Sequence, residues 1–140
     1  MSALPDDFAL PRIDAFNGPW FTSGTLAVQQ CAQCDVLQHP PEEICHACGS
    51  MTFGHRVLTP RGTIYSYTVV HHPTSNALAA SVPYVVVLVS IDEEPAVRVL
   101  GNLVDAPLGA ARIGLPVEAV WDECRTDDGT VILLPRWRPS

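Results

Sequence analysis

Lysine is absent from this 140-residue sequence, and its eight basic residues are all arginines. Fifteen acidic residues outnumber them, which gives a formal net charge of −7. Proteins that bind nucleic acids neutralise phosphates with clustered basic side chains, and anionic membrane surfaces attract similar clusters. Scattered arginines in an acidic chain therefore argue against nucleic acid and against a membrane surface as partners.

Long hydrophobic segments are also missing. The longest apolar run, 82–89, is far shorter than the roughly 20 residues that cross a membrane as a helix. The first residues contain neither the basic nor the apolar region of a signal peptide. With 47% hydrophobic residues the chain can still bury a core. We expect a cytoplasmic protein with one domain or two very small ones.

Helix signals are weak because thirteen prolines and nine glycines divide the chain into short pieces. The best helical candidate is 13–20, and Gly18-Pro19 is expected to limit it. Strand-forming residues dominate from Thr25 onward. The expected strands are 25–30, 52–58, 63–70, 84–91, 96–104, 115–123 and 130–134.

Turn signals separate these strands. Gly101 interrupts one of them and suggests a β-bulge, whereas 127–129 (Asp-Asp-Gly) predicts a hairpin turn. The acidic run 92–94 is expected to be a solvated hairpin tip. Five strands after Pro60, within about 80 residues, predict a small closed or nearly closed β-barrel.

The expected organisation has three parts. Residues 1–24 form an N-terminal helical or extended segment, and 25–59 form a cysteine-bearing module. Residues 60–140 form the barrel with a C-terminal tail.

The clearest motif is a pair of C-x2-C sequences. Cys31 and Cys34 are separated by ten residues from Cys45 and Cys48. Each tight turn can present two sulfurs to one ion, so four thiolates can close a tetrahedral zinc site. Such a site has no open position for water, which indicates a structural role for one zinc ion per chain. Disulfides are disfavoured without a secretion signal, and a rubredoxin-like iron site is the alternative.

Other candidate ligands and nucleophiles are weaker. His39 and His46 lie close to the cysteines in sequence, but four thiolates already complete the coordination. Cys124 stands alone without an evident base, so a packing role is expected. The sequence also lacks the G-x-S-x-G, P-loop, G-x-G-x-x-G and H-E-x-x-H motifs. No catalytic residues are therefore assigned.

The order of several segments is familiar. They are LAVQQCAQC (26–34), HPP (39–41), ICHACG (44–49), RGTIYSYTVVH (61–71), PYVVVLVSID (83–92), VLGNLV (99–104), IGLPVEAV (113–120) and LPRWRP (134–139). Together they resemble the zinc-ribbon plus OB-fold proteins associated with acyl-CoA metabolism, long classed as a domain of unknown function. The resemblance extends over residues 14–139. One departure is Asp35, where the family usually has glycine after the first cysteine pair.

The resemblance implies a mainly β protein with a short N-terminal helix, a rubredoxin-like zinc ribbon and a five-stranded OB-fold barrel. Members usually pair with a thiolase-like enzyme, which is a thiolase, an acyltransferase or a retro-aldol lyase of sterol side-chain degradation. Some associate with an enoyl-CoA hydratase. The chain is thereby expected to be a non-catalytic accessory subunit that helps form the CoA-ester channel of its partner, in an assembly of two plus two copies.

One strand also suggests a covered surface. A strand of a small barrel usually has one wet face, yet 84–89 lacks polar alternation. Its outer face is therefore expected to be covered by the zinc-bearing module, by a partner subunit or by self-association.

Two short segments are candidate CoA- or partner-binding sites. His71 and His72 follow an expected strand and precede a loop rich in small residues. Arg136, Trp137 and Arg138 form the most basic aromatic segment, in which arginine can bind phosphate and the indole can stack on adenine. The simpler interpretation is a polar strand end in the first segment, and a packed indole with solvated arginines in the second.

Two other functions stay open. A stand-alone acyl-CoA-binding protein would deliver substrate without a partner, and tight CoA-ester binding by the isolated chain would support it. Zinc ribbons and OB-folds also bind nucleic acids, but this sequence shows no basic groove of the kind that single strands require.

Overall fold

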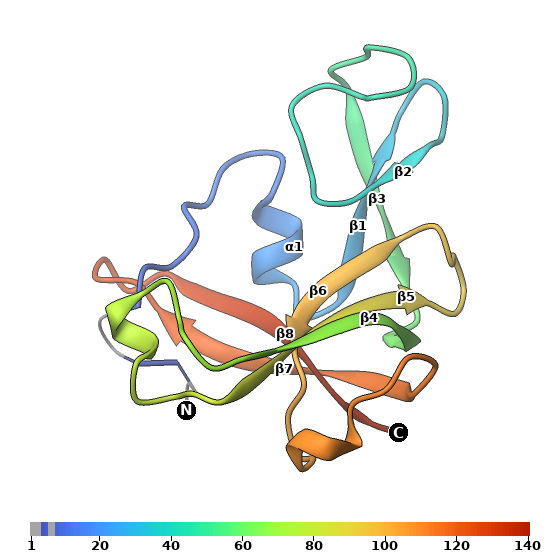
Figure 1. Cartoon of the computed structure of the whole chain (residues 1–140). Helices are drawn as coiled ribbons and strands as arrows, with labels where there is room; N and C mark the ends of the chain where they lie inside the picture. Colours follow the sequence, from blue (N-terminus) through green and yellow to red (C-terminus); the bar gives the residue numbers. More distant parts are fainter. Residues whose placement is uncertain (1–3, 6–7) are drawn as a thin grey trace.

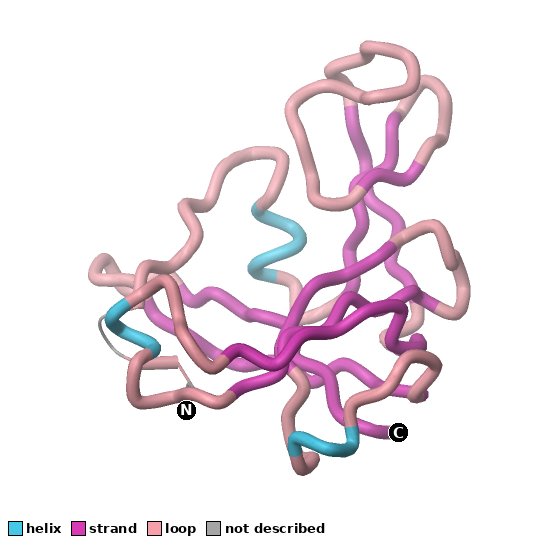
Figure 2. Tube along the Cα trace, viewed as in Figure 1, coloured by secondary structure: helices cyan, strands magenta, loops and turns pink. Residues whose placement is uncertain are grey.

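The computed structural model describes residues 4–5 and 8–140. Its helices are α1 (Gly18–Thr22) and two single 3-10 turns, η1 (Asn76–Leu78) and η2 (Leu108–Ala110). Its strands are β1 (Leu26–Cys31), β2 (Leu37–Gln38), β3 (Phe53–Leu58), β4 (Arg61–Val70), β5 (Tyr84–Ile91), β6 (Arg98–Asn102), β7 (Pro116–Arg125) and β8 (Val131–Pro139). Figure 1 shows β1–β3 projecting away from the other strands, and Figure 2 shows that strands and loops make up most of the fold.

The larger sheet is a five-stranded barrel. Its strands follow the order β6-β5-β4-β7-β8, and all neighbours are antiparallel. The barrel closes just beyond β6, where Leu103 forms a parallel bridge to Trp137 of β8. The Val104 N–H donates to the Trp137 carbonyl there at 2.7 Å. The predicted small barrel after Pro60 is thus confirmed.

Strand β5 shows how the barrel builds its core. Val85, Val87, Val89 and Ile91 are buried, whereas the alternate residues are only partly covered. An apolar run without polar alternation in sequence therefore alternates in burial. Among the outward residues, Leu88 lines a cavity between the barrel, α1 and residues 39–41, which follow β2. The expected cover over the outer face is thus incomplete in this chain.

The β-bulge predicted at Gly101 is wrong. Gly101 pairs regularly with Val87, and the irregularity lies in β4 between Ile64 and Ser66. Glycine at 101 instead allows close packing, because a Cβ there would lie 2.9 Å from Cδ1 of Trp137. The buried indole of Trp137 therefore explains why residue 101 is a glycine.

The predicted helix is displaced along the sequence. The helix α1 begins at Gly18, where the candidate 13–20 was expected to weaken, because proline in the first helical turn breaks no hydrogen bond. Asp14 and Asn17 close a turn before it, in which the N–H of each donates to the side-chain oxygen of the other at 2.8 and 2.9 Å. Within the described residues, no helix is long and apolar enough to cross a membrane.

The last hairpin is longer than predicted. Strands β7 and β8 pair continuously from Val117 opposite Pro139 to Arg125 opposite Val131. Residues 135–139 therefore belong to the sheet and do not form a tail. The predicted turn at 127–129 is confirmed, with Gly129 at a φ of 85°. The two-residue strand β2 was not predicted, since it is too short to produce an alternating pattern.

The hairpin between β5 and β6 connects the barrel to the smaller sheet. Glu93 accepts hydrogen bonds from the N–H and the hydroxyl of Thr59 at 2.8 and 2.6 Å. Arg56 of β3 forms ion pairs with Glu93 at 3.5 Å and with Glu94 at 2.8 Å. The predicted solvated tip is confirmed, since the side chains of Glu93 and Glu94 are 38% and 37% exposed, and these two glutamates also hold β3 against the barrel.

Candidate functional site

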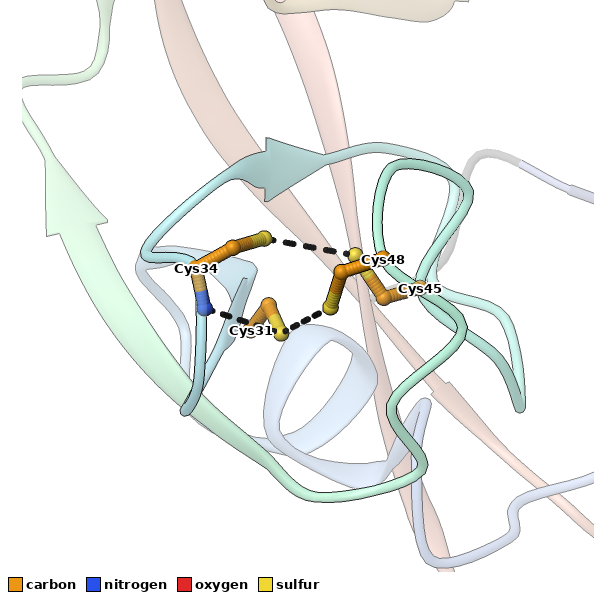
Figure 3. A group of neighbouring side chains, drawn as sticks. All are labelled: Cys31, Cys34, Cys45 and Cys48. Carbon is orange, nitrogen blue, oxygen red and sulfur yellow. Dashed lines mark hydrogen bonds between the residues drawn. The ribbon is translucent and has the colours of Figure 1, made fainter.

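Four thiols gather in the turns that follow β1 and β2, as Figure 3 shows. All four sulfur atoms lie within 4.8 Å of one another. Cys31 Sγ is 3.5 Å from Cys48 Sγ, and Cys34 Sγ is 3.6 Å from Cys45 Sγ. A tetrahedral zinc ion with bonds of about 2.3 Å would place its sulfur ligands about 3.8 Å apart. No disulfide joins the cysteines, so the donor set and its spacing fit zinc.

Two similar turns present these thiols. The Asp35 N–H donates to the Cys31 carbonyl at 3.1 Å, and the Gly49 N–H donates to the Cys45 carbonyl at 2.9 Å. Asp35 and Gly49 both adopt left-handed backbone, with φ of 62° and 78°. Aspartate enters this region more easily than most residues. The departure from glycine at position 35 therefore leaves the ligand turn intact.

Backbone N–H groups favour the thiolate form of two ligands. The Cys34 N–H, 3.5 Å from Cys31 Sγ, lowers the pKa of the Cys31 thiol to about 6, and the Gln33 N–H at 3.4 Å acts in the same direction. The Cys48 N–H likewise lowers the pKa of Cys45. Because the thiolate is the metal ligand, these donors favour zinc binding at Cys31 and Cys45. The pKa values of Cys34 and Cys48 are raised instead, by burial and by hydrogen bonds to the other cysteine sulfurs.

Two buried glutamines support the ligand turns, and the sequence analysis missed both. Gln29 Oε1 accepts hydrogen bonds from Gln38 Nε2 and from the Glu42 N–H, each at 2.9 Å. Gln29 Nε2 donates to the Glu42 carbonyl at 2.7 Å, and Gln38 Oε1 accepts from the His46 N–H at 3.1 Å. This network fixes the loop that carries the second cysteine pair. A glutamine at an inward position of a strand was the signal available.

The other histidine and cysteine candidates lie outside the metal site. The His39 ring is 4.2 Å from the Trp20 ring, and burial lowers the pKa of His39 to about 4, so its imidazole is neutral. His46 is exposed beside the second cysteine pair but is not among the clustered ligand atoms. Cys124 is buried on β7, as expected for a packing residue.

The two candidate binding segments lie on different strands. His71 and His72 are exposed and follow the end of β4. The Arg136–Arg138 segment lies on β8 opposite residues 118–120 of β7, and Glu118 there pairs with Arg61 at the opposite end of β4. The structure thus gives two separate places rather than one site.

Strand alternation divides the Arg136–Trp137–Arg138 segment. Trp137 is fully buried, so its ring belongs to the barrel core and is unavailable for stacking on adenine. Arg136 donates through Nε to Asp122 at 3.0 Å, with side chains only 11% and 6% exposed. Arg138 pairs with Glu118 at 2.9 Å near the surface. The arginines expected to be solvated are therefore both held by carboxylates.

A cavity of about 800 Å³ lies between the N-terminal segment, α1, residues 39–41 and the outer side of the barrel. Figure 1 shows α1 above the barrel strands and beside the smaller sheet. Trp20, Leu88, Leu134 and Pro40 contribute apolar walls. Sequence analysis missed this cavity, because its walls come from segments far apart in the chain.

Comparison with known proteins identifies the two parts of the fold. Residues 22–53 match the rubredoxin-like zinc ribbon domain of ChsH2, and residues 55–122 match its C-terminal OB-fold domain. A DUF35 domain-containing scaffold protein of Methanocaldococcus jannaschii is 30% identical over 113 residues, which cover 79% of this chain and 78% of that protein. The chain belongs to the ChsH2/DUF35 family. The predicted zinc ribbon, OB-fold and short helix are thus confirmed, and the four cysteines form the structural zinc site of a ChsH2/DUF35 ribbon.

A solved structure supports this ChsH2/DUF35 assignment. An Ltp2-ChsH2(DUF35) aldolase contains a chain that is 36% identical in sequence, with a TM-score of 0.76. The match covers 93% of this chain and 98% of that chain. Nearly all of the chain therefore corresponds to one chain of that aldolase.

Two longer relatives are named as hydratase subunits. A probable enoyl-CoA hydratase alpha subunit of Thermomonospora curvata is 36% identical over 133 residues. The 3-oxo-4,17-pregnadiene-20-carboxyl-CoA hydratase alpha subunit of Mycobacterium tuberculosis is 31% identical over 128 residues. The matches cover 93% and 86% of this chain but only 39% and 40% of those proteins. The chain thus spans about two fifths of their length.

Proposed function

We propose that this chain is a non-catalytic accessory subunit of an acyl-CoA-processing complex. Its main partner is a thiolase-like enzyme that makes or breaks a carbon–carbon bond, and its substrate class includes CoA esters of the sterol side-chain type. One observation carries this proposal: nearly all of the chain matches one chain of an Ltp2-ChsH2(DUF35) aldolase at 36% identity.

The residues of the chain itself are consistent with an accessory role. Its four-cysteine site is closed by protein ligands and leaves no position for a substrate. In the described part of the chain, the four cysteines are the one group of three or more potential ligands close enough to share a metal ion. The catalytic groups are therefore assigned to the partner.

A hydratase is the second partner that we propose. The relatives from Thermomonospora curvata and Mycobacterium tuberculosis are named as alpha subunits of CoA-ester hydratases, and this chain corresponds to part of each. A shared accessory subunit would place two successive reactions on the same acyl-CoA. A stand-alone acyl-CoA-binding protein is the alternative function.

Three exposed or partly exposed side chains are proposed partner or CoA contacts. His71 and His72 stand at the end of β4, and Arg138 lies at the surface of β8. Arginine and histidine can each donate to phosphates or carboxylates. Arg136 is a weaker candidate, because Asp122 and Asn102 already accept its hydrogen bonds.

The first experiment is a tagged pull-down from the native host, with mass spectrometry of partners and metal analysis of the same eluate. We expect a thiolase-like protein in near-equal amount and one zinc ion per chain. Recovery of the chain alone, still with zinc, would contradict the accessory role and favour the stand-alone binder.

A charge reversal then tests the contact surface. Arg138→Glu should reduce recovery of the partner, whereas Arg125→Glu on the same hairpin should leave it unchanged. Both arginines are exposed, and each forms an ion pair with a glutamate of β7, Arg125 with Glu123 and Arg138 with Glu118. The two variants are therefore matched in local chemistry. Equal recovery with both would remove Arg138 from the interface.

A further inference from the structure

The cavity beside α1 is built differently from the rest of the surface. Its walls combine aromatic residues of α1 with aliphatic residues of β5, β6 and β8 and with the two prolines after His39. A volume of about 800 Å³ lies within the range of small-molecule sites, which are concave and mostly apolar. An apolar ligand would displace water from these walls, which is favourable.

Leucine at position 100 marks the open side of this cavity. It lines the cavity, yet 64% of its surface is exposed, which makes it one of the more exposed large apolar residues of the described chain. Its cross-strand neighbour Leu88 lines the same wall. Two leucines side by side on the outer face of a barrel form a surface that is suited to an apolar body and not to solvent.

The charged residues that line the cavity are basic, whereas the chain as a whole is acidic. Three of the eight arginines line it, and no aspartate or glutamate of residues 4–5 and 8–140 does, although the chain has fifteen acidic residues. Arg136 is balanced by Asp122, which is outside the lining. Arg98 lies 3.8 Å above the Tyr65 ring, a contact that leaves its N–H edge available. Neither Arg12 nor Arg98 forms an ion pair with a carboxylate of the described residues.

A buried polar atom adds an independent signal. The Nδ1 atom of His39 is buried against Trp20 and has no hydrogen-bond partner among the described residues. Buried polar atoms are normally satisfied, and Trp121 Nε1 and Trp137 Nε1 are the other two exceptions among the described residues. His39 is the one of the three that lines the cavity, so a ligand there could satisfy it. His39 and Trp20 both line the cavity.

We propose that this cavity binds an anionic amphiphile, with its apolar acyl body between α1 and the β5–β6 wall and its anionic group at Arg98 and Arg12. The anion is the carboxylate of a free acid or a phosphate of CoA in an acyl-CoA, since arginine binds both. The choice of an acyl ligand rests on the proposed function, whereas the apolar walls and the arginines in the lining do not depend on it.

A fluorescence titration tests the site in the zinc-loaded full chain. The probe is cis-parinaric acid, held below its micellar concentration, and the competitors are oleate, oleoyl-CoA and CoA alone. We expect saturable binding that oleate and oleoyl-CoA displace and that CoA does not. If oleoyl-CoA displaces the probe and oleate does not, the anion is a phosphate of CoA. Displacement by oleate alone would assign it to a carboxylate.

Two exposed positions allow variants that should fold normally. Leu100→Glu places a carboxylate on the apolar wall, and we expect it to weaken probe binding about tenfold or more, which is about 1.4 kcal/mol. Its matched control is Ile113→Glu, because Ile113 is 71% exposed and lies outside the cavity. Arg98→Gln should weaken binding by a smaller factor, and Arg112→Gln is its control.

Several results would overturn the proposal. These are no saturable probe binding, displacement by CoA alone, or equal affinity of Leu100→Glu and Ile113→Glu. The two proposals fail separately. A recovered thiolase-like partner without probe binding contradicts the cavity alone, and probe binding without a partner contradicts the accessory role alone. The probe could also be displaced by the purified partner and not by oleate. This result would identify the cavity as a protein interface and overturn the proposal that it binds an anionic amphiphile.

Discussion

The ribbon and the barrel are held together by different forces. Most of the buried hydrophobic side chains lie in the barrel, around the fully buried Trp137. Strand β1 connects the two regions, with Leu26 and Val28 in the hydrophobic core and Cys31 at the metal site. Beyond the core, the buried side chains of the ribbon are Ala27, two of the cysteines and the Gln29–Gln38 pair. A sheet of three short strands thus relies on a metal ion and a polar network where it is too small for a core.

The comparison predicts that each region is sensitive to a different kind of damage. Metal loss should affect the ribbon and spare most of the barrel. Overpacking should affect the barrel and spare the ribbon. The variants below test this difference, from the largest expected effect to the smallest.

Removal of a zinc ligand should have the largest effect. Cys45→Ser leaves three thiolates, and we expect zinc content to fall to a small fraction of an equivalent, because structural zinc sites need all four ligands. The ribbon should unfold while Trp137 stays buried in the barrel. Metal analysis measures the ribbon, and amide hydrogen exchange of β7 and β8 measures the barrel.

The matched control for this variant is His46→Ala. His46 lies next to Cys45 but outside the cluster of ligand atoms, so zinc content should not change. Faster amide exchange of β7 and β8 in Cys45→Ser would show that the barrel depends on the ribbon, and the contrast between the two regions would then fail.

Overpacking next to the barrel core should have the second largest effect. In Gly101→Ala the new Cβ would meet Trp137 Cδ1 at 2.9 Å and the Pro135 carbonyl oxygen at 3.1 Å. We expect a loss of unfolding free energy of about 1–3 kcal/mol, the usual cost of excess volume in a packed core. Urea denaturation measures it, and zinc content should stay at one equivalent.

Gly109→Ala is the control, since a Cβ at Gly109 would meet no atom within 4 Å. Its stability should stay close to that of the wild type. A similar loss in both variants would mean that backbone freedom, and not the Trp137 contact, explains glycine at these positions.

Loss of the polar network should weaken the ribbon by a comparable or smaller amount. Gln29→Leu removes the acceptor for the Gln38 side chain and the Glu42 N–H. Unsatisfied buried groups of this kind cost about 1–3 kcal/mol. Zinc should also dissociate faster, because the loop of the second cysteine pair loses its support. Chelator competition measures this rate, with the exposed Gln33→Leu as control; equal rates would remove the network from the metal site.

The sequence was most informative where one residue type carries the chemistry. The two C-x2-C motifs predicted the metal site because the ligand spacing is local and needs no tertiary contact. The barrel strands were predictable because β-branched residues mark each strand. Pro19 was misinterpreted as a stop signal because proline fits the first turn of a helix as well as its end.

Residues whose partners are distant in the chain were the ones missed. Gly101 needs no bulge; its reason is Trp137, a residue 36 positions later on another strand. The network of Gln29 and Gln38 forms only when β1 and β2 pair. The cavity beside α1 similarly depends on the N-terminal segment, the ribbon and the barrel meeting. Such features follow from tertiary packing, and no local pattern encodes them.

The hairpin that joins the two regions should show the smallest effect. Hydrogen bonds from Thr59, together with Arg56, lower the pKa of Glu93 below its ordinary value. A carboxylate with a depressed pKa stabilises the fold above its unfolded pKa, and this contribution disappears as the pH falls through the folded pKa.

Glu93→Gln should therefore lower the Tm slightly near neutral pH, and the difference from the wild type should vanish in acid. The pairs are exposed at the surface, so the effect should be smaller than that of Gln29→Leu. Thermal unfolding at several pH values measures it, with Asp92→Asn as the neighbouring control. A pH-independent difference would mean that Glu93 acts through neutral hydrogen bonds, and a large loss of stability would mean that the ribbon and barrel form one cooperative unit rather than two regions held by different forces.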